Sequence, residues 1–327
     1  MKRLLFVLGL LSLGLLTVSL LIGPAAIGPI ESLEAMVAPA DTPLALVMQE
    51  IRLPRAILAF MVGASLGLAG AAMQGYLRNP LAEPGLLGIS GSAALGAVLA
   101  IQSGLATAFP LGLPLAALSG ALMGVLLITL LAGRQGGTLS LILAGIAISA
   151  LASAMVSLVL NLSPNPFATS EIVFWMMGSL ADRSMEHVVL ALPFIVIGAV
   201  MLLGLGRPLD AMTLGEDAAE ALGMRVASVR RRLIVGAALV VGASTAVAGT
   251  IGFVGLVVPH LLRPFVGAMP GPLLPASALG GAIMVLLADI LVRVIVPEAD
   301  LKLGVLTALI GAPLFLHLIY QTRRTLA

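Results

Sequence analysis

Long runs of apolar residues, separated by short polar or glycine- and proline-containing segments, extend along almost the whole chain. A helix needs about 20 apolar residues to cross the hydrocarbon core of a bilayer. Runs of this kind predict ten membrane-spanning helices, near residues 4–23, 51–76, 86–101, 112–132, 139–161, 188–205, 233–249, 252–267, 273–294 and 303–321. The third and the eighth are short or interrupted, which is typical of helices that line a cavity instead of facing lipid.

The first apolar run follows Lys2 and Arg3 and resembles a secretory signal peptide in this respect. The apolar region of a signal peptide is about 7–15 residues long, whereas the run at 4–23 is long enough to span a bilayer. We therefore interpret it as the first transmembrane helix.

The composition of the chain is that of a membrane protein. Hydrophobic residues make up 60% of the 327 residues and charged residues 10%, compared with about 25% charged residues in a soluble domain. We expect an all-α polytopic protein in the lipid bilayer, with a single transmembrane domain over residues 1–327. The net charge of +2 predicts no nucleic-acid partner, and the absence of cysteine excludes disulfides and cysteine-based metal sites.

Basic residues are divided unequally between the two sides of the predicted helices. Cytoplasmic loops carry an excess of Lys and Arg, so the richer side is assigned to the cytoplasm, together with both termini. That side holds Lys2, Arg3, Arg78, Arg134, Arg207, Arg225, Arg230, Arg231, Arg232, Arg263, Arg323 and Arg324. The outer side holds Arg52, Arg55, Arg183, Arg293 and Lys302.

One long polar segment, residues 207–232, interrupts the apolar pattern on the cytoplasmic side. Thr213 with Glu216 three residues later fits a capping box, the next residues are good helix formers, and Gly223 can supply a C-cap. Residues 224–228 could begin a second short helix. Two short helices here would form a docking surface for a soluble partner. The alternative is an ordinary loop whose arginines fix the topology.

On the outer side, the loop from 163 to 187 contains an Asn-Pro helix breaker and then the helix-start signal Thr169-Ser170-Glu171. This pattern predicts a short helix at the outer interface. Trp175, the one tryptophan of the chain, is expected at the level of the lipid headgroups, where tryptophan is enriched.

The stretch from residue 70 to residue 97 reads GAAMQGYLRNPLAEPGLLGISGSAALGA. It begins in a helix of small residues that should end at Arg78, because Asn79-Pro80 cannot continue a helix. Glu83-Pro84-Gly85 makes a turn, after which a glycine-rich short helix re-enters the membrane. Irregular backbone at this depth is tolerated only where it lines a protein-enclosed pathway.

This stretch resembles the permeases of type II ABC importers, which take up iron-siderophores, haem or cobalamin. Similar motifs follow in the family's order: IRLPR from Ile51, WMMGSL from Trp175, GTIGFVGLVVPH from Gly249, ADI from Ala288 and GVLTA from Gly304. The resemblance implies a fold with ten helices per subunit in the bacterial inner membrane. It also implies a homodimer that works with two ATP-binding cassette subunits and a periplasmic substrate-binding protein.

The resemblance further implies roles for individual residues, in three groups. The ATPase would dock on Leu214, Gly215, Glu216, Ala219, Leu222 and Gly223. The binding protein would pair its glutamates with Arg52, Arg55 and Arg293; the alternative is snorkelling or pairing with Glu50 and Asp289. The cytoplasmic gate would comprise Asn79, Leu81, Thr138 and Leu139, with a structural turn as the alternative role of Asn79.

The chain itself is not expected to be an enzyme. A phosphate-binding loop needs a glycine-rich turn followed by lysine and then Ser or Thr, and neither Lys2 nor Lys302 lies in such a setting. ATP and Mg would therefore be bound by the partner ATPase, with no cofactor or metal in this chain. His187, His260 and His317 are expected to be packing residues.

The alternative function is an ion-coupled secondary transporter of a small solute. Such a transporter calls for paired intramembrane carboxylates. Apart from Asp289, the predicted helices offer few carboxylates, and Arg293, one turn later, can neutralise the charge of Asp289. The importer is therefore the preferred interpretation, and the sequence does not select among its substrates. We also expect the second helix, which leads to Asn79 and Leu81, to line the transport route.

Overall fold

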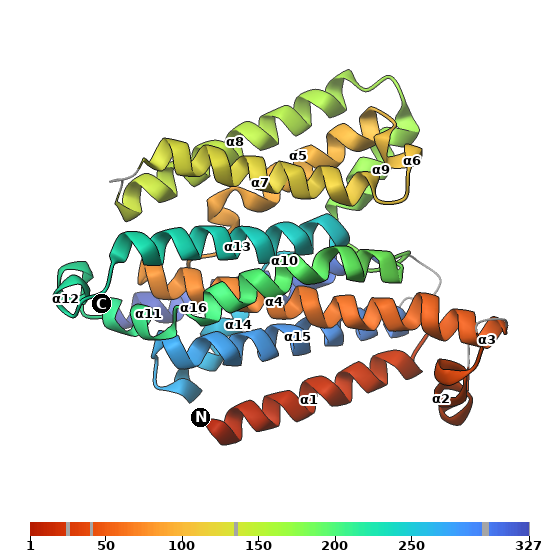
Figure 1. Ribbon diagram of the computed structural model, residues 1–327, viewed down its shortest axis with the longest axis horizontal. Coiled ribbons are helices and arrows are strands. Elements are labelled where there is room, and N and C mark those ends of the chain that lie inside the picture. Colours follow the sequence, from red (N-terminus) through yellow and green to blue (C-terminus); the bar gives the residue numbers. More distant parts are fainter. Residues whose placement is uncertain (24–26, 40–41, 134–136, 296–300, 327) are drawn as a thin grey trace.

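The computed structural model describes residues 1–23, 27–39, 42–133, 137–295 and 301–326. These residues form a bundle of long helices that run in roughly the same direction, up and down (Figure 1). Both chain ends lie at the same end of the bundle as the short helices α11 and α12, whereas α2, α3 and α9 lie at the opposite end. We refer to these as the inner and the outer end.

The principal helices are α1 (Lys2–Leu21), α4 (Leu53–Leu77), α5 (Ile89–Gln102), α7 (Gly112–Ala132), α8 (Thr138–Leu162), α10 (Met185–Leu203), α13 (Val226–Ala248), α14 (Val254–Leu262), α15 (Pro270–Ile295) and α16 (Leu303–Leu326). Short helices connect them: α2 (Pro29–Val37), α3 (Pro43–Leu46), α6 (Leu105–Ala108), α9 (Pro166–Met176), α11 (Gly206–Met212) and α12 (Glu216–Ala221). The π-helical η1 (Val47–Arg52) and the 3-10 helices η2 (Pro84–Leu87) and η3 (Arg263–Val266) complete the described part.

The predicted number of membrane-spanning segments is confirmed. Within the described residues, seven helical spans are long and apolar enough to cross a bilayer, and three shorter apolar helices accompany them at Ile89–Gln102, Val254–Val266 and Leu303–His317. The first two of these correspond to the runs that the sequence marked as short or interrupted.

Two predicted helix starts differ from the structure. The second span begins at Pro43 instead of residue 51, because α3 and η1 run directly into α4. A proline ring collides with the carbonyl four residues earlier, and the wider π turn before α4 makes room for Pro54. α13 begins at Val226, about two turns before the predicted start, so the arginine triplet 230–232 is helical.

Helix α4 is the centre of the bundle and is buried along most of its length. Its glycines lie against the backbone of neighbouring helices: Gly63 faces Gly281, Gly67 faces Ser277, and Gly70 faces Gly255. A Cβ atom at Gly70 would overlap the carbonyl oxygen of Gly255. Small residues of this kind let helices approach closely in a membrane, where packing replaces the hydrophobic driving force.

This burial contradicts the expectation that the second helix lines the transport route. Ser65 and Gln74, both in α4, are 2% and 1% exposed. The Gln74 amide nitrogen donates to the carbonyl of Leu256 at 3.2 Å, and its oxygen accepts from Arg263 at 2.7 Å. Within this chain α4 is therefore a packed interior helix, because glycine-to-backbone contacts cover its faces.

The break after α4 forms as the sequence predicts. α4 ends at Leu77, and Arg78 follows in the left-handed conformation with φ 49°. The Asn79 side chain accepts the backbone N–H of Leu81 at 2.9 Å and so stabilises the turn. Further on, the Glu83 carboxylate accepts the backbone N–H of Phe253 at 3.3 Å, which joins this break to the one between α13 and α14.

The predicted outer helix is present as α9, but the predicted position of Trp175 is wrong. Trp175 is 8% exposed and packs inside the protein. Thr250 donates to the carbonyl of Met176, and Gly249 lies against the Trp175 carbonyl. These contacts hold the end of α9 against the loop after α13, which turns the indole inward instead of toward headgroups.

Substitution of Gly70 by Val should destabilise the protein, since the new side chain meets the Gly255 backbone. Overpacking of this kind costs about 1–3 kcal/mol, and we expect a lower melting temperature of the purified protein in detergent. Gly9→Val is the matched control, because nothing lies within 4 Å of a Cβ at Gly9 on α1. Equal melting temperatures for the two variants would contradict the assigned role of α4.

Candidate functional site

The polar segment 207–232 contains two short helices, one of which the sequence predicts. α12 is the predicted helix after Thr213, whereas the other short helix is α11, because residues 224–228 lead directly into α13. Thr213 does not cap α12: its hydroxyl donates to the carbonyl of Asp210 at 2.7 Å, and Gly215 occupies the N-cap with φ 110°. Gly223 ends α12 in a left-handed conformation with φ 83°, as predicted.

Two exposed leucines flank α12, which itself carries the acidic residues Glu216, Asp217 and Glu220. Leu214 and Leu222 are 69% and 60% exposed. Ala219 is fully buried, so it anchors α12 to the bundle and does not face a partner, contrary to the expectation for this residue. α12 thus shows one inward alanine and a rim of exposed leucines at the inner end of the molecule (Figure 1).

Asp210 fastens α11 to the start of α15. Its Oδ1 atom accepts the backbone N–H of Gly271 at 2.7 Å. Gly271 is the second residue of α15, where N–H groups have no partner within the helix and a carboxylate is favourable. The sequence analysis assigned no role to Asp210, which is one of four acidic residues in the polar segment.

The four predicted gate residues occupy two places at the inner end. Asn79 and Leu81 form the turn after α4, and Thr138 and Leu139 begin α8. Leu139 is 69% exposed. The Thr138 hydroxyl donates to Oε1 of Glu216 at 3.1 Å, so the structure brings one gate residue together with one residue of the polar segment.

The predicted docking arginines lie at the outer end, and two of them face inward. Arg52 is 3% exposed and donates to the carbonyls of Leu20 and Leu21 at 3.0 and 3.1 Å. Arg293 is 8% exposed and donates to the carbonyls of Ser19 and Ile22 at 2.9 and 2.6 Å. These carbonyls belong to the last turn of α1 and to its C-cap, where they lack partners within the helix and favour a cation.

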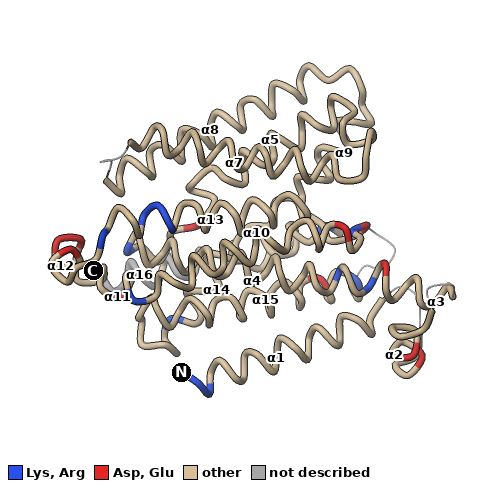
Figure 2. The backbone as a smooth tube through the Cα atoms, viewed as in Figure 1, with Lys and Arg blue, Asp and Glu red and all other residues tan. Residues whose placement is uncertain are grey.

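Asp289 joins the outer arginines into one buried cluster. Its side chain is 1% exposed and forms ion pairs with Arg55 and Arg293 at 2.9 and 2.8 Å. Acidic and basic groups accordingly lie together in the outer half of the bundle (Figure 2). In this arrangement Arg52 and Arg293 anchor α1, and docking through them stays a prediction that requires α1 to move. Arg55 keeps 18% of its side chain exposed.

A polar cavity of about 290 Å³ lies near this outer end, beside Trp175, Arg183, His187 and Lys302. Burial lowers the pKa of Arg183, while the neighbouring Asp182 raises it. His187 accepts the backbone N–H of Ser184 on Nδ1 at 3.3 Å. It therefore helps to cap α10, which is the packing role predicted for this histidine.

These features define a polytopic α-helical membrane protein whose polar segment 207–232 lies at its inner end. The chain belongs to the FecCD transport family, whose sequence profile matches residues 10–321. It is accordingly an ABC transporter permease and not the ATPase, and ATP is bound by a partner subunit. Of the two functions considered from the sequence, membership of this family supports the ATP-driven importer and excludes the ion-coupled secondary transporter.

Individual relatives agree with this assignment. The uncharacterized ABC transporter permease protein YvrB of Bacillus subtilis is 40% identical over 85% of this chain and 80% of its own length. The hemin transport system permease protein HmuU of Yersinia pestis is 40% identical over 84% and 83%. The vitamin B12 import system permease protein BtuC of Citrobacter koseri is 37% identical over 88% of each chain.

Solved structures show the same fold. A chain described as a metal-chelate type ABC transporter in an inward-facing conformation superposes with a TM-score of 0.87 at 36% identity. That comparison covers 98% of this chain and 100% of the other. The PsaBC structure from Streptococcus pneumoniae, with a TM-score of 0.52 at 16% identity, is similar in fold alone.

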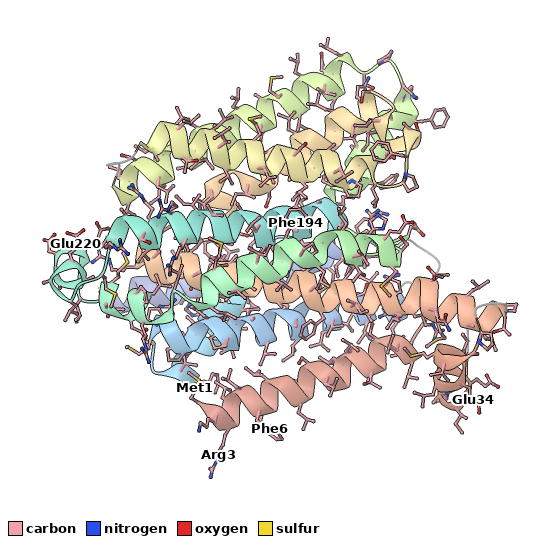
Figure 3. All side chains as sticks on the ribbon, in the orientation of Figure 1. Met1, Arg3, Phe6, Glu34, Phe194 and Glu220 are labelled. Atoms are coloured by element: carbon pink, nitrogen blue, oxygen red, sulfur yellow. The ribbon has the colours of Figure 1, made fainter. Side chains whose placement is uncertain are left out.

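Removal of the Asp289 carboxylate should destabilise the outer end, because Asp289→Ala leaves Arg293 buried without its counter-ion. Breaking a buried ion pair costs about 3–5 kcal/mol, which should appear as a large drop in melting temperature. Glu34→Ala is the control, since Glu34 lies at the same end and points away from the bundle (Figure 3). A melting temperature equal to that of the control would mean that the cluster is not structural.

Proposed function

We propose that this chain imports a metal chelate or a metal-tetrapyrrole, namely an iron-siderophore, haem or cobalamin. The match of the FecCD profile over residues 10–321 is the observation that carries the proposal. It is supported by relatives named for hemin and vitamin B12 transport and by the metal-chelate type structure. The direction of transport is from the periplasm to the cytoplasm.

The proposed assembly is a homodimer of permeases with two ATP-binding cassette subunits, which bind ATP and Mg, and a periplasmic binding protein. The proposed location is the bacterial inner membrane, with both termini and the polar segment 207–232 in the cytoplasm. Support comes from the position of both chain ends at the same end of the bundle as α12 (Figure 1) and from the arginines at that end (Figure 2).

Within this assembly the ATPase docks on the polar segment. Leu214 and Leu222 supply the exposed apolar contacts, and desolvated apolar anchors commonly dominate binding energy at an interface. Gly215 and Gly223 set the direction of the backbone on either side of α12, since both adopt positive φ values. Glu216 and Ala219 face the bundle and hold α12 in place.

The remaining site residues are proposed for the two ends of the route. Asn79, Leu81, Thr138 and Leu139 form the cytoplasmic gate, in keeping with their position at the inner end. At the outer end Arg55 is the partly exposed member of the arginine cluster, so it is the first contact for a glutamate of the binding protein. Arg52 and Arg293 would contact the binding protein only after α1 has moved away from them.

Leu222→Asp should prevent ATPase docking, because a carboxylate replaces an apolar contact and would be buried unpaired in the interface. We expect at least about a tenfold loss of ATPase co-purification with the permease. Leu33→Asp is the matched control: Leu33 is a similarly exposed leucine, 63% against 60%, but it lies on α2 at the outer end. Undiminished co-purification with Leu222→Asp would contradict the docking role.

The substrate class is tested with the permease, its ATPase and its binding protein reconstituted in liposomes. One of an iron-siderophore, haem or cobalamin should be taken up in an ATP-dependent manner, and a free amino acid should not. Uptake of the amino acid without any of the three chelates would overturn the proposed substrate class and leave the family assignment intact.

A further inference from the structure

A polar contact joins the polar segment to the membrane-spanning helices at the inner end. The Thr138 hydroxyl, at the start of α8, donates to Oε1 of Glu216, the first residue of α12, at 3.1 Å. We name these two residues the inner junction.

The hydrogen bond of the inner junction has a defined direction. A threonine hydroxyl carries one hydrogen, and Thr138 gives it to the Glu216 carboxylate. A hydrogen bond to a carboxylate is shorter and stronger than one between two neutral groups.

The inner junction connects a short helix of the polar segment to a membrane-spanning helix. Glu216 moves with α12, because it is the first residue of that helix, and Thr138 moves with α8 for the same reason. The other inward contact of α12 described above is the apolar Ala219, which can slide, whereas a charge-assisted hydrogen bond fixes both distance and direction.

We propose that the Thr138–Glu216 hydrogen bond transmits movement of α12 to α8 and so opens or closes the cytoplasmic gate. The proposal rests on the proposed function of the polar segment as the ATPase docking site. Within that function it makes Glu216 and Thr138 positioning residues, which act on each other rather than on the ATPase or the substrate.

The test uses the complete complex in liposomes and measures substrate uptake and ATP hydrolysis separately. Thr138→Val keeps the shape of the side chain but removes the hydroxyl. We expect uptake per ATP hydrolysed to fall about tenfold, the scale of a lost hydrogen bond to a charged group, with ATPase co-purification unchanged. Thr138→Ser keeps the hydroxyl and should restore coupling, which a role in packing alone would not predict.

A double-mutant cycle then asks whether the two residues act through one bond. Glu216→Ala should reduce coupling as Thr138→Val does, and the double variant should be no worse than the more severe single variant. Ser140→Ala on α8 is the matched control, since its side chain is exposed two residues from Thr138. This control should retain wild-type coupling.

Three results would overturn the proposal. They are normal coupling in Thr138→Val, failure of Thr138→Ser to restore coupling, and fully additive losses in the double variant. Failure of the underlying proposed function has a different signature: Leu222→Asp would then keep its ATPase. A Thr138→Val variant that loses the ATPase would also reject the proposal, because Thr138 would then act through docking.

Discussion

Close approach of helix backbones around α4 is the constraint on which the rest of the structure depends. In a bilayer, lipid tails are as apolar as leucine, so helices associate through packing and polar contacts. The glycines of α4 provide that packing on two sides, against α15 through Gly63 and Gly67 and against α14 through Gly70. Because α4 is fixed in this way, the polar groups near its outer and inner ends are also held in position.

The outer polar cluster attaches α1 to the bundle through hydrogen bonds and ion pairs, in addition to packing. α1 is largely exposed along its length, and it is an apolar helix that packs mainly against α15. Arg52 and Arg293 bind the carbonyls at its C-terminal end, and Asp289 balances the charge. One carboxylate thereby joins α1, α4 and α15, and the buried Arg293 has both a counter-ion and hydrogen bonds, as burial in a membrane requires.

The sequence predicted the helices well because their apolar runs match the bilayer thickness, and it predicted the break at Asn79-Pro80 because proline chemistry is local. The predictions from the sequence failed where contacts between distant parts of the chain determine the local structure. Trp175 turned inward because Gly249 and Thr250 hold α9 from a distant part of the chain. The cap expected from Thr213 was displaced because the Glu216 side chain bonds to Thr138 instead, a contact over 78 residues of sequence that no local pattern encodes.

Two side-chain hydrogen bonds attach the polar segment to the membrane-spanning helices. The two helices concerned differ in how firmly they are held. Through Asp210, α11 is tied to α15, which the glycines of α4 hold firmly in the core. Through Glu216, α12 is tied to α8, whose Gly145 lies against the carbonyl of Leu86 in η2. η2 follows the turn that carries Asn79 and Leu81. A displacement of α12 is therefore resisted by α15 and passed to α8 and η2, so that one movement reaches both halves of the proposed gate.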